Sequence, residues 1–429
     1  MSGAGAMSHN NTGVNTRVVS AHMVIIGGGI AGLWLLNRLS NCGHDVVLLE
    51  KNALGSHQTL ASQGIIHGGL KYALNGVLSP ASSAIADMPA RWRACLEGRG
   101  EIDLRNTRVL SEHYYMWCAG SMRSRLKTFL GSKALRGRID TLKPADYPAF
   151  FAEGLASQTD TPRGTLYRLS DFVLDTPSLL QTLAQPWHDR IVRGVDISIA
   201  ADPRKNNNAA CVHVQGQDGR IEISAAHIIL CAGEGNEALL ADWQTSESLD
   251  KPLMQRRPLH MVCVRVSHPA PAYLHCIGDS IGMTPRLTIT SHPCHDGRTG
   301  EWIWYLGGEL AESGVHLDTA SQQTRAKAEL TTLFPWVDFS SATWHSFMIN
   351  RAEPRIADLK RPDNAFVSGC ANLMVCWPTK LSLCPNLGDR VCELLPDTLS
   401  GLRDALTSPE LASLLPPGGH ANPPWEIIR

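Results

Sequence analysis

The chain contains 429 residues, of which 43% are hydrophobic and 18% are charged, and its formal net charge at pH 7 is −1. A chain of this length can bury a large core and is expected to form two domains. Because the net charge is close to zero, the protein as a whole has no long-range electrostatic attraction to nucleic acid or to an anionic membrane. Twelve cysteines occur without a CxxC pair and mostly in apolar runs, which is typical of reduced, buried thiols. We expect a cytoplasmic protein with no metal site, and we leave peripheral membrane association open.

The first fifty residues contain the strongest local pattern. Residues 1–20 are rich in small and polar residues, and we expect a disordered leader there. An apolar strand at 23–26 follows, then a glycine-rich turn at 27–32, a helix, and a second apolar strand at 46–49 that ends on Glu50. Because the glycine turn interrupts the longest apolar stretch, we predict no integral membrane segment. The apolar side of the helix is predicted to consist of Ile30, Leu33, Leu36 and Leu39.

This strand, turn, helix and acidic strand end form the pattern of a dinucleotide-binding βαβ unit. Gly27 permits the tight turn, Gly29 lets the backbone approach a pyrophosphate, and Gly32 lets the helix pack closely on the strand. Ile30 and Ala31 lie at the helix N-terminus, where unpaired N–H groups and the helix dipole attract phosphates. The acid that ends the second strand can accept hydrogen bonds from a ribose. The complete context favours this interpretation over a βαβ unit with an empty turn.

The rest of the chain mixes helix and strand patterns. We predict helices at 80–98, from 176 onward, at 319–333 and at 387–395. We predict strands at 113–118, 211–214, 221–224, 227–230, 261–266, 302–306 and 365–368, with glycine turns at 231–235 and at Gly369. The residues from 407 to 429 are rich in proline and are predicted to form a tail.

The order of these elements predicts that one domain is assembled from separated segments, because strand–turn–helix pieces reappear near residues 228 and 365. A β-rich domain is inserted between them. The nucleotide-binding segments are predicted at 21–105, 169–250 and 344–406, and the inserted segments at 106–168 and 251–343.

Several segments together resemble the FAD-dependent D-amino-acid-oxidase-like superfamily, over about residues 22–396. Ile65–Tyr72 resembles the IHGGLRY segment of FAD-dependent glycerol-3-phosphate dehydrogenases. Thr379–Ser382 resembles the GGK-L-T-T segment near the C-terminal end of that group's flavin domain. His57–Thr59, with the later Ile66–His67 pair, also resembles L-2-hydroxyglutarate dehydrogenases.

Two departures from the glycerol-3-phosphate dehydrogenases concern the substrate. Pro378 and Thr379 stand where those enzymes have two glycines, and their Arg-Pro motif is replaced here by Asn350–Arg355. The helical C-terminal extension of that group also has no counterpart. The resemblance therefore implies the flavin more directly than it implies the substrate.

The resemblance implies an α/β fold, with a glutathione-reductase-type FAD-binding Rossmann domain and an inserted antiparallel β-sheet substrate domain. It implies hydride transfer to FAD from a small anionic alcohol, either a 2-hydroxy acid or a compound like glycerol-3-phosphate. An amino acid or secondary amine is the alternative substrate, and a flavoprotein that keeps FAD without catalysis is the alternative function. The electron acceptor is left open between oxygen, a quinone and a carrier protein.

The segment after Glu50 favours FAD over NAD, because a glycine-, serine- and histidine-rich loop follows at once in place of further βα repeats. Small residues there would let backbone N–H groups reach flavin oxygens without an intervening Cβ. The alternative is a flexible surface loop. The residues expected to hold FAD are Gly27, Gly29, Ile30, Ala31, Gly32, Glu50, Lys51, Ser62, Gln63, Gly64, Ile66, His67, Ala232, Gly233, Gly369, Lys380 and Leu381.

Two histidines are candidates for the catalytic base that takes the substrate proton. His67 lies in the flavin loop, and His260 begins a strand that often faces the flavin in this superfamily. Either could instead be a packing residue. His57 could be a site of covalent flavin attachment. Lys380 would stabilise the reduced flavin as a cation beside N1, with a solvent-exposed lysine as the alternative.

Arg351 is the candidate for binding the anionic group of the substrate, with Arg355 in reserve. A guanidinium binds a carboxylate or phosphate through two parallel hydrogen bonds and keeps its charge. The alternative for Arg351 is an exposed ion pair with Glu353 or Asp358. The cluster at 292–296 contains two histidines, a cysteine and an aspartate, but its glycine and proline context suits an exposed loop better than a metal site.

Overall fold

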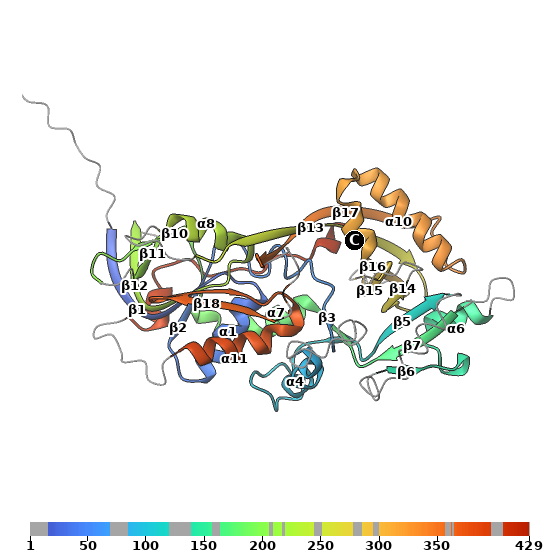
Figure 1. Ribbon diagram of the computed structural model, residues 1–429, viewed down its shortest axis with the longest axis horizontal. Coiled ribbons are helices and arrows are strands. Elements are labelled where there is room, and N and C mark those ends of the chain that lie inside the picture. Colours follow the sequence, from blue (N-terminus) through green and yellow to red (C-terminus); the bar gives the residue numbers. More distant parts are fainter. Residues whose placement is uncertain are drawn as a thin grey trace, which may run out of the picture.

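The computed structural model consists of two halves, each built on a β-sheet (Figure 1). Two long strands, β13 (Met254–Ser267) and β17 (Thr343–Pro354), extend from one half into the other. The structure describes residues 16–68, 85–119, 139–156, 164–205, 209–216, 219–243, 251–277, 285–294, 300–356, 362, 364–395 and 406–428. Within these ranges, none of the helices is both long enough and apolar enough to cross a membrane.

The first sheet brings together the strands that carry the nucleotide-binding signals. Its strand order is β10-β11-β12-β1-β2-β9. β19 also pairs with β12, at the carboxyl end of that strand, whereas β11 pairs with its start. β1 (Thr16–Ile26) lies parallel to β2 (Val46–Glu50) and to β12 (Arg220–Leu230), and β12 lies parallel to β19 (Leu373–Trp377). Because these four strands share one direction, their carboxyl ends meet at the same edge of the sheet. In open α/β sheets, ligands bind at this edge.

Helices cover the first sheet. α1 (Ile30–Asn41) packs beside α11 (Cys384–Leu394) and α7 (Thr176–Ala184). The predicted apolar side of α1 is buried, as are the neighbouring side chains of the core. The predicted start of α7 is confirmed, because the side chain of Asp175 accepts a hydrogen bond from the N–H of Ser178.

The second sheet has the order β17-β13-β16-β15-β14-β5-β7-β6. Its described pairs are antiparallel except for β14 with β5, so the expected antiparallel sheet contains one parallel pair. α10 (Thr319–Leu333) occupies the predicted residues and begins at Asp318, whose carboxylate accepts a hydrogen bond from Ser321 N at 2.8 Å. It packs into an apolar cluster with Val262 and Val264 of β13, on one face of the sheet.

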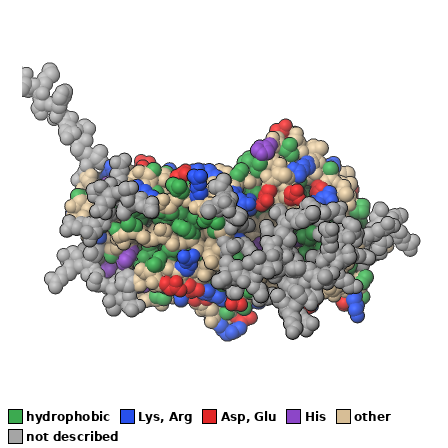
Figure 2. Space-filling model, in the orientation of Figure 1, with side chains coloured by type: hydrophobic (Ala, Val, Ile, Leu, Met, Phe, Trp, Pro, Cys, Tyr) green, Lys and Arg blue, Asp and Glu red, His purple; other side chains and the backbone are tan. Residues whose placement is uncertain are grey.

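The remaining elements fill the space around the two sheets. A three-stranded sheet of order β3-β8-β4 joins β3 (Ile65–Ile66), β8 (Phe172–Leu174) and β4 (Val109–Ser111). The other described elements include β5 (Tyr114–Ala119), β6 (Ile139–Thr141), β7 (Gly164–Leu169), β9 (Ile191–Arg193), β10 (Val195–Ala201), β11 (Ala210–Gln215), β14 (Leu274–Ile277), β15 (Leu287–Pro293), β16 (Glu301–Gly307), β18 (Phe366–Cys370), α4 (Met88–Leu96), α6 (Ala149–Ala156), α8 (Asn236–Asp242), α9 (Glu309–Ser313) and α12 (Ser408–Ala412). On the face shown in Figure 2, acidic and basic side chains are interspersed, in keeping with the small net charge.

The ends of several predicted elements are shifted, as in β13, which begins at Met254 and not at 261, and four larger differences change the organisation. Thr16–Ser20 belong to β1 and not to the leader, because they pair with β12 from Arg220 to Ser224. The strands predicted at 221–224 and 227–230 are one continuous strand, since no turn residue separates them. β17 belongs to the second sheet along its length, so the boundary predicted at 344 falls after Pro354.

The fourth difference concerns the C-terminal residues, which are an ordered part of the core. α12 begins with a capping box between Thr407 and Glu410. Further on, the ring of Trp425 stacks on that of His292, with the ring centroids 3.7 Å apart. The prolines predicted a tail, but Leu411 and Leu415 are buried in the core of the first sheet and Trp425 in that of the second.

Candidate active site

A cavity of about 470 Å³ lies at the carboxyl ends of the parallel strands. The turn from β1 to α1 forms part of its wall. Gly27 has a φ of +113°, a conformation that side chains other than glycine rarely adopt. A Cβ at Gly29 would lie 3.0 Å from Thr59 Oγ1, so a side chain at this cavity-lining position would crowd Thr59. Ile30 and Ala31, at the N-terminus of α1, also line the cavity.

Glu50 contributes a fixed acid to the same cavity. Its Oε2 accepts a hydrogen bond from Gly28 N at 2.5 Å, and its Oε1 accepts one from Asn52 N at 2.7 Å. The residue is 8% exposed. Because two backbone donors hold the carboxylate in place, its remaining lone pairs are preorganised to accept hydrogen bonds from a sugar diol.

The segment after β19 forms another part of the cavity wall. Trp377 Nε1 donates to Gly233 O at 3.0 Å, which ties this segment to the glycine turn that follows β12. Thr379 has a φ of +62°, and Lys380 and Leu381 line the cavity immediately after it. A hydrogen bond to Cys376, together with burial, raises the pKa of Cys231, so this thiol beside the cavity is protonated at neutral pH.

Most of the predicted cofactor residues are brought together around this cavity. Those that line it are Gly27, Gly29, Ile30, Ala31, Glu50, Lys51, Ser62, Ala232, Gly233, Lys380 and Leu381. Gly32 packs against the backbone of Gly27 and supports the turn from behind. Gly369 was predicted wrongly as a turn residue: it lies within β18, opposite Met374, and the turn follows at Ala371, whose φ is +51°.

The sequence analysis missed the two residues that follow His57. Thr59 Oγ1 accepts a hydrogen bond from Ile30 N at 3.0 Å at the start of α1, and Gln58 Oε1 accepts one from Ala352 N at 3.1 Å in β17. His57 itself is exposed and lines the cavity, with a φ of +66°. Their position directly before the small-residue loop was the available signal, since polar side chains there can reach the phosphate turn.

His67 does not line the cavity, but its backbone is hydrogen-bonded to a residue next to the cavity wall. Its backbone N–H donates to Ser382 Oγ at 2.8 Å, and Ser382 directly follows the cavity-lining Leu381. Its Nδ1 lies 3.2 Å from Asp171 Oδ2, and its ring lies parallel to that of His275 with centroids 6.0 Å apart. The side chain of His67 is 39% exposed. Gly69–Tyr72, the remainder of the motif, lie outside the described residues.

Three other loop residues predicted to hold the cofactor do not line the cavity. Gln63 donates from Nε2 to the carbonyl oxygens of Thr288 and Tyr305, so it joins the loop to the second sheet. Ile66 is fully buried in β3, and Gly64 accepts a hydrogen bond from Leu174 N at 2.9 Å. These residues shape the loop through their backbone and packing.

The prediction that His260 is a base facing the flavin is wrong. Its Nδ1 lies 3.0 Å from Gly314 O and its Nε2 lies 3.1 Å from Ser346 Oγ, so protein groups occupy both ring nitrogens. The residue is 3% exposed and does not line the cavity. The cause is strand alternation: His260 shares the face of β13 with Val262 and Val264, which pack beneath α10.

Arg351 lies on the other face of the second sheet. It shares this face with Phe347 and Ile349, because side chains two residues apart along β17 point the same way. The ring of Phe347 stacks on that of Tyr305. Tyr305 Oη donates to Ala61 O at 2.7 Å, so this face turns toward the loop that carries Ser62. Arg351 Nη2 lies 3.2 Å from Glu312 Oε1, an ion pair that the sequence did not predict, and the expected partner Asp358 lies outside the described residues.

Arg355, the reserve candidate, is exposed and lies just beyond the end of β17. Its backbone N–H donates to Leu253 O at 2.8 Å, and it does not line the cavity. Arg351 does not line the cavity either, but unlike Arg355 it lies within β17, on the sheet face that meets the loop carrying Ser62.

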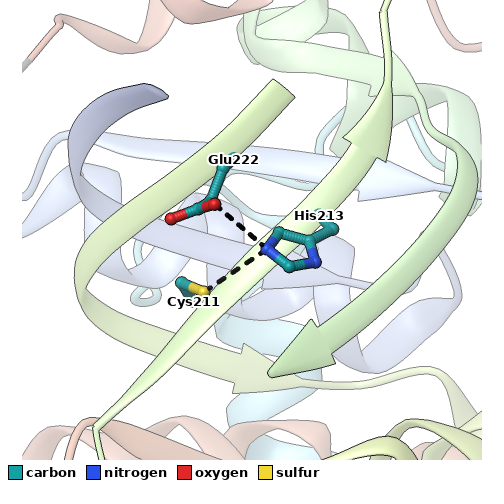
Figure 3. A group of neighbouring side chains, drawn as sticks. All are labelled: Cys211, His213 and Glu222. Atoms are coloured by element: carbon teal, nitrogen blue, oxygen red, sulfur yellow. Dashed lines mark hydrogen bonds and ion pairs between the residues drawn. The ribbon is translucent and has the colours of Figure 1, made fainter. Parts of the chain in front are cut away.

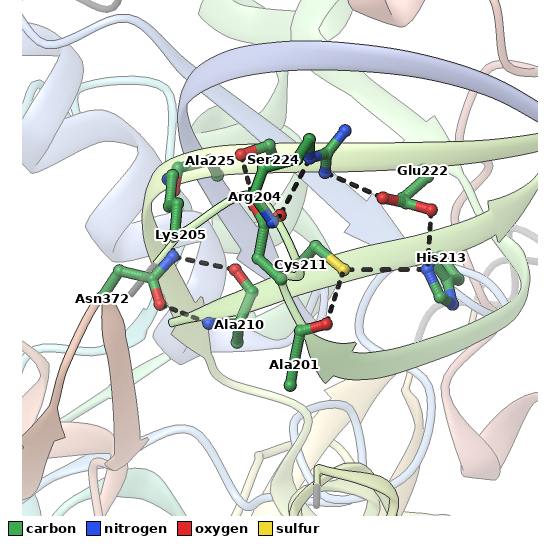
Figure 4. A network of polar contacts seen from close by, with 11 residues as sticks. Ala201, Arg204, Lys205, Ala210, Cys211, His213, Glu222, Ser224, Ala225 and Asn372 are labelled. Atoms are coloured by element: carbon green, nitrogen blue, oxygen red, sulfur yellow. Dashed lines mark hydrogen bonds and ion pairs between the residues drawn. The ribbon is translucent and has the colours of Figure 1, made fainter. Parts of the chain in front are cut away.

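A separate group of possible metal ligands lies on β11 and β12, formed by Cys211, His213 and Glu222 (Figure 3). Arg220 donates to His213 Nδ1 at 3.0 Å, so the ring proton lies on Nε2, which faces the thiol and the carboxylate. Arg204 forms an ion pair with Glu222 (Figure 4), and burial raises the pKa of Cys211 to about 11. These contacts account for the cluster as a network of hydrogen bonds and ion pairs, and we assign no metal to it.

The chain matches the family model described as FAD dependent oxidoreductase, DAO, over residues 22–373. It is 44% identical over 414 residues to the probable FAD-dependent oxidoreductase PA4991 of Pseudomonas aeruginosa, which covers 96% of this chain and 99% of that protein. The crystal structure of PA4991 has a TM-score of 0.74 to this chain at 39% identity, and the match again covers 96% of this chain and 99% of that one.

Two more distant crystal structures share the fold. Glycine oxidase from Geobacillus kaustophilus has a TM-score of 0.62 at 16% identity, covering 91% of this chain and 99% of that one. L-alpha-glycerophosphate oxidase from Mycoplasma pneumoniae, solved with FAD bound, has a TM-score of 0.60 at 12% identity, covering 91% and 98%. The names of these two proteins indicate different substrate classes, so the likeness bears on the fold and not on the substrate.

Proposed function

This chain belongs to the DAO family of FAD-dependent oxidoreductases, and we propose that it oxidises a small anionic alcohol, such as a 2-hydroxy acid or a polyol phosphate. The flavin supplies the hydride acceptor. The cavity fits that cofactor: the turn at Gly27–Ile30 would receive the pyrophosphate, and Glu50 would receive the ribose of the adenosine. The flavin ring would then lie toward Ser62 and the segment Thr379–Leu381.

The observation that carries the proposal is the pair formed by His67 and Asp171. An alcohol must lose its hydroxyl proton as the hydride leaves its carbon, so its oxidation needs a base within reach of the oxygen. A neutral amine already has a lone pair that can form the new π bond, and its N–H proton need not leave in the same step. A partly exposed histidine beside a buried carboxylate therefore supports an alcohol as the substrate over an amine.

We propose that Arg351 binds the anionic group of the substrate. Its position on the sheet face that meets the flavin loop supports this role. The guanidinium forms an ion pair with Glu312, and 16% of the Arg351 side chain is exposed. Lys380, which lines the cavity beside Leu381, would place a second cation near the ring and stabilise the negative charge that the reduced flavin carries.

Replacing Arg351 by alanine should weaken substrate binding by about 2–5 kcal/mol, because a charge-assisted contact is lost in a partly desolvated site. Arg351→Lys should lie between wild type and Arg351→Ala, since an ammonium cannot form two parallel bonds. The apparent Kd is measured from the substrate dependence of flavin bleaching. An unchanged Kd in Arg351→Ala, with a raised Kd in Arg355→Ala, would move the anion site to Arg355.

The substrate class is tested by isosteric pairs that differ only in the reacting group. Lactate and alanine form one pair, and 2-hydroxyglutarate and glutamate form another, each offered as both enantiomers together with glycerol-3-phosphate. Turnover is followed with a redox dye and with oxygen, and ammonia release is measured in parallel. We expect oxidation of a hydroxy or phosphate compound without ammonia. Oxidation of the amino acids with release of ammonia would establish the alternative.

A further inference from the structure

We propose that Asp171 is a positioning residue that fixes the proton of His67 on Nδ1, which leaves Nε2 free to accept the proton of the substrate. This inference rests on the proposed function, because it assigns a partner to the histidine that acts there as a base. Asp171 lies 104 residues from His67 in the chain. No motif in the sequence links the two.

Strand pairing brings the two residues together. β3 and β8 are antiparallel, with Ile65 opposite Val173 and Ile66 opposite Phe172. The next position in this register places His67 opposite Asp171. Because β3 and β8 are buried, the register is strongly specified, and the imidazole and the carboxylate meet without a flexible loop between them.

Both oxygens of Asp171 have a defined partner. Oδ1 accepts a hydrogen bond from Gly68 N at 2.9 Å, and Oδ2 lies 3.2 Å from His67 Nδ1. An ionised carboxylate can only accept hydrogen bonds, so the ring nitrogen facing it must carry the proton. The other ring nitrogen, Nε2, then has a free lone pair, as a general base requires.

The surroundings limit the ways in which this pair could rearrange. Asp171 is 4% exposed, so water does not replace its contacts. The backbone of His67 is held by Ser382 Oγ, and Ser382 is fully buried. The ring of His275 lies parallel to that of His67, and His275 Nδ1 is 3.0 Å from Thr288 Oγ1, while 39% of the His67 side chain stays exposed. The imidazole can therefore meet a substrate at Nε2 while Nδ1 stays on the carboxylate.

Asp171→Asn is the informative substitution. The single carbonyl oxygen of the amide would accept the Gly68 N–H, so its NH2 group would face His67 Nδ1. That nitrogen must then accept a hydrogen bond, and the proton moves to Nε2, where it blocks the base. We expect the rate constant for flavin reduction to fall at least ~100-fold. The FAD content and the apparent substrate Kd should stay within about twofold of wild type, since Asp171 does not line the cavity.

Two further variants separate positioning from simple structural support. Asp171→Glu keeps a carboxylate and should recover at least tenfold of the rate lost in Asp171→Asn. Asp175→Asn removes a similarly buried carboxylate, which caps α7 through Ser178 N and forms an ion pair with Arg108. It should lower the melting temperature without slowing flavin reduction. Equal slowing in Asp171→Asn and Asp175→Asn would indicate a structural effect and overturn the proposal.

The double variant His67→Asn/Asp171→Asn tests whether Asp171 acts through His67. We expect it to be no slower than His67→Asn alone. If the rate losses of the two single variants multiply in the double variant, the proposal is overturned. A normal rate in Asp171→Asn beside a slow His67→Asn would also overturn it, but would leave His67 as the base and the proposed function intact. A normal rate in His67→Asn would overturn both.

A measurement on the wild-type holoenzyme determines directly which ring nitrogen of His67 carries the proton. In protein labelled with 15N-histidine, the His67 signals, assigned by their absence in His67→Asn, should show Nδ1 protonated and Nε2 unprotonated above the titration range of the ring. Protonation at Nε2 in the substrate-free enzyme would overturn the proposal.

Discussion

Replacing Gly29 by valine should produce a folded protein that purifies without its yellow colour. A Cβ at this position lies 3.0 Å from Thr59 Oγ1, and the branched side chain would occupy the wall that the pyrophosphate must approach. We expect FAD affinity to fall roughly 100-fold or more, which corresponds to about 2.7 kcal/mol. The measurement is the flavin-to-protein absorbance ratio of the purified protein, followed by titration of the apoprotein with FAD.

Gly43→Asn is the matched control for this loss. Gly43 follows α1 and has a φ of +87°, whereas Gly29 precedes α1 with a φ of −79°, and a Cβ at Gly43 would have no neighbour within 4 Å. Asparagine tolerates this conformation better than most residues. The variant should therefore keep its full FAD content. A Gly29→Val protein that retains FAD at wild-type affinity would show that the cofactor does not lie against the β1–α1 turn.

Substituting His67 by asparagine should slow flavin reduction by about 10²–10⁴-fold, the contribution typical of a positioned base. FAD content should not change, since His67 lies outside the cavity wall. The measurement is stopped-flow bleaching of the flavin under anaerobic conditions, and His67→Ala should regain part of its rate when imidazole is added. An exposed histidine far from the loop, His188, provides the control variant His188→Asn, which should reduce its flavin at the wild-type rate. A wild-type rate constant in His67→Asn would remove the base from the proposed function.

The cofactor half of the site could be predicted from the sequence because each of its signals is local. The β1–α1 turn and Glu50 lie within one βαβ unit, so the spacing of glycines and the terminal acid specifies their geometry directly. The helix predicted at 319–333 is confirmed, and in the structure the side chain of Asp318 caps it. Elements of this kind depend little on the rest of the fold.

The substrate half could not be predicted in the same way, because it depends on which face of a strand meets which layer. His260 and Arg351 lie on neighbouring, paired strands, yet one points beneath α10 and the other toward the flavin loop. A shift of one residue exchanges the two faces, and nothing in a local pattern selects between them. The pairing of His67 with Asp171 is a further case, since it arises only when β3 meets β8.

The C-terminal residues illustrate a different limit. Prolines and glycines from residue 416 to 424 suggest a chain without regular structure. In the fold, this segment makes isolated bridges with Leu54 and Val192, and then places Trp425 against the second sheet. Its order comes from tertiary contacts and not from local propensity.

We propose that this chain removes a hydride from a small anionic alcohol and passes it to FAD bound in the cavity. The most direct test is anaerobic addition of the hydroxy acids and of glycerol-3-phosphate to the purified yellow protein, with the flavin absorbance followed over time. We predict that at least one of these compounds bleaches the oxidised flavin bands completely, and that the matching amino acid at the same concentration does not. A flavin that stays oxidised with every hydroxy and phosphate compound, while an amino acid or secondary amine bleaches it, would contradict the claim.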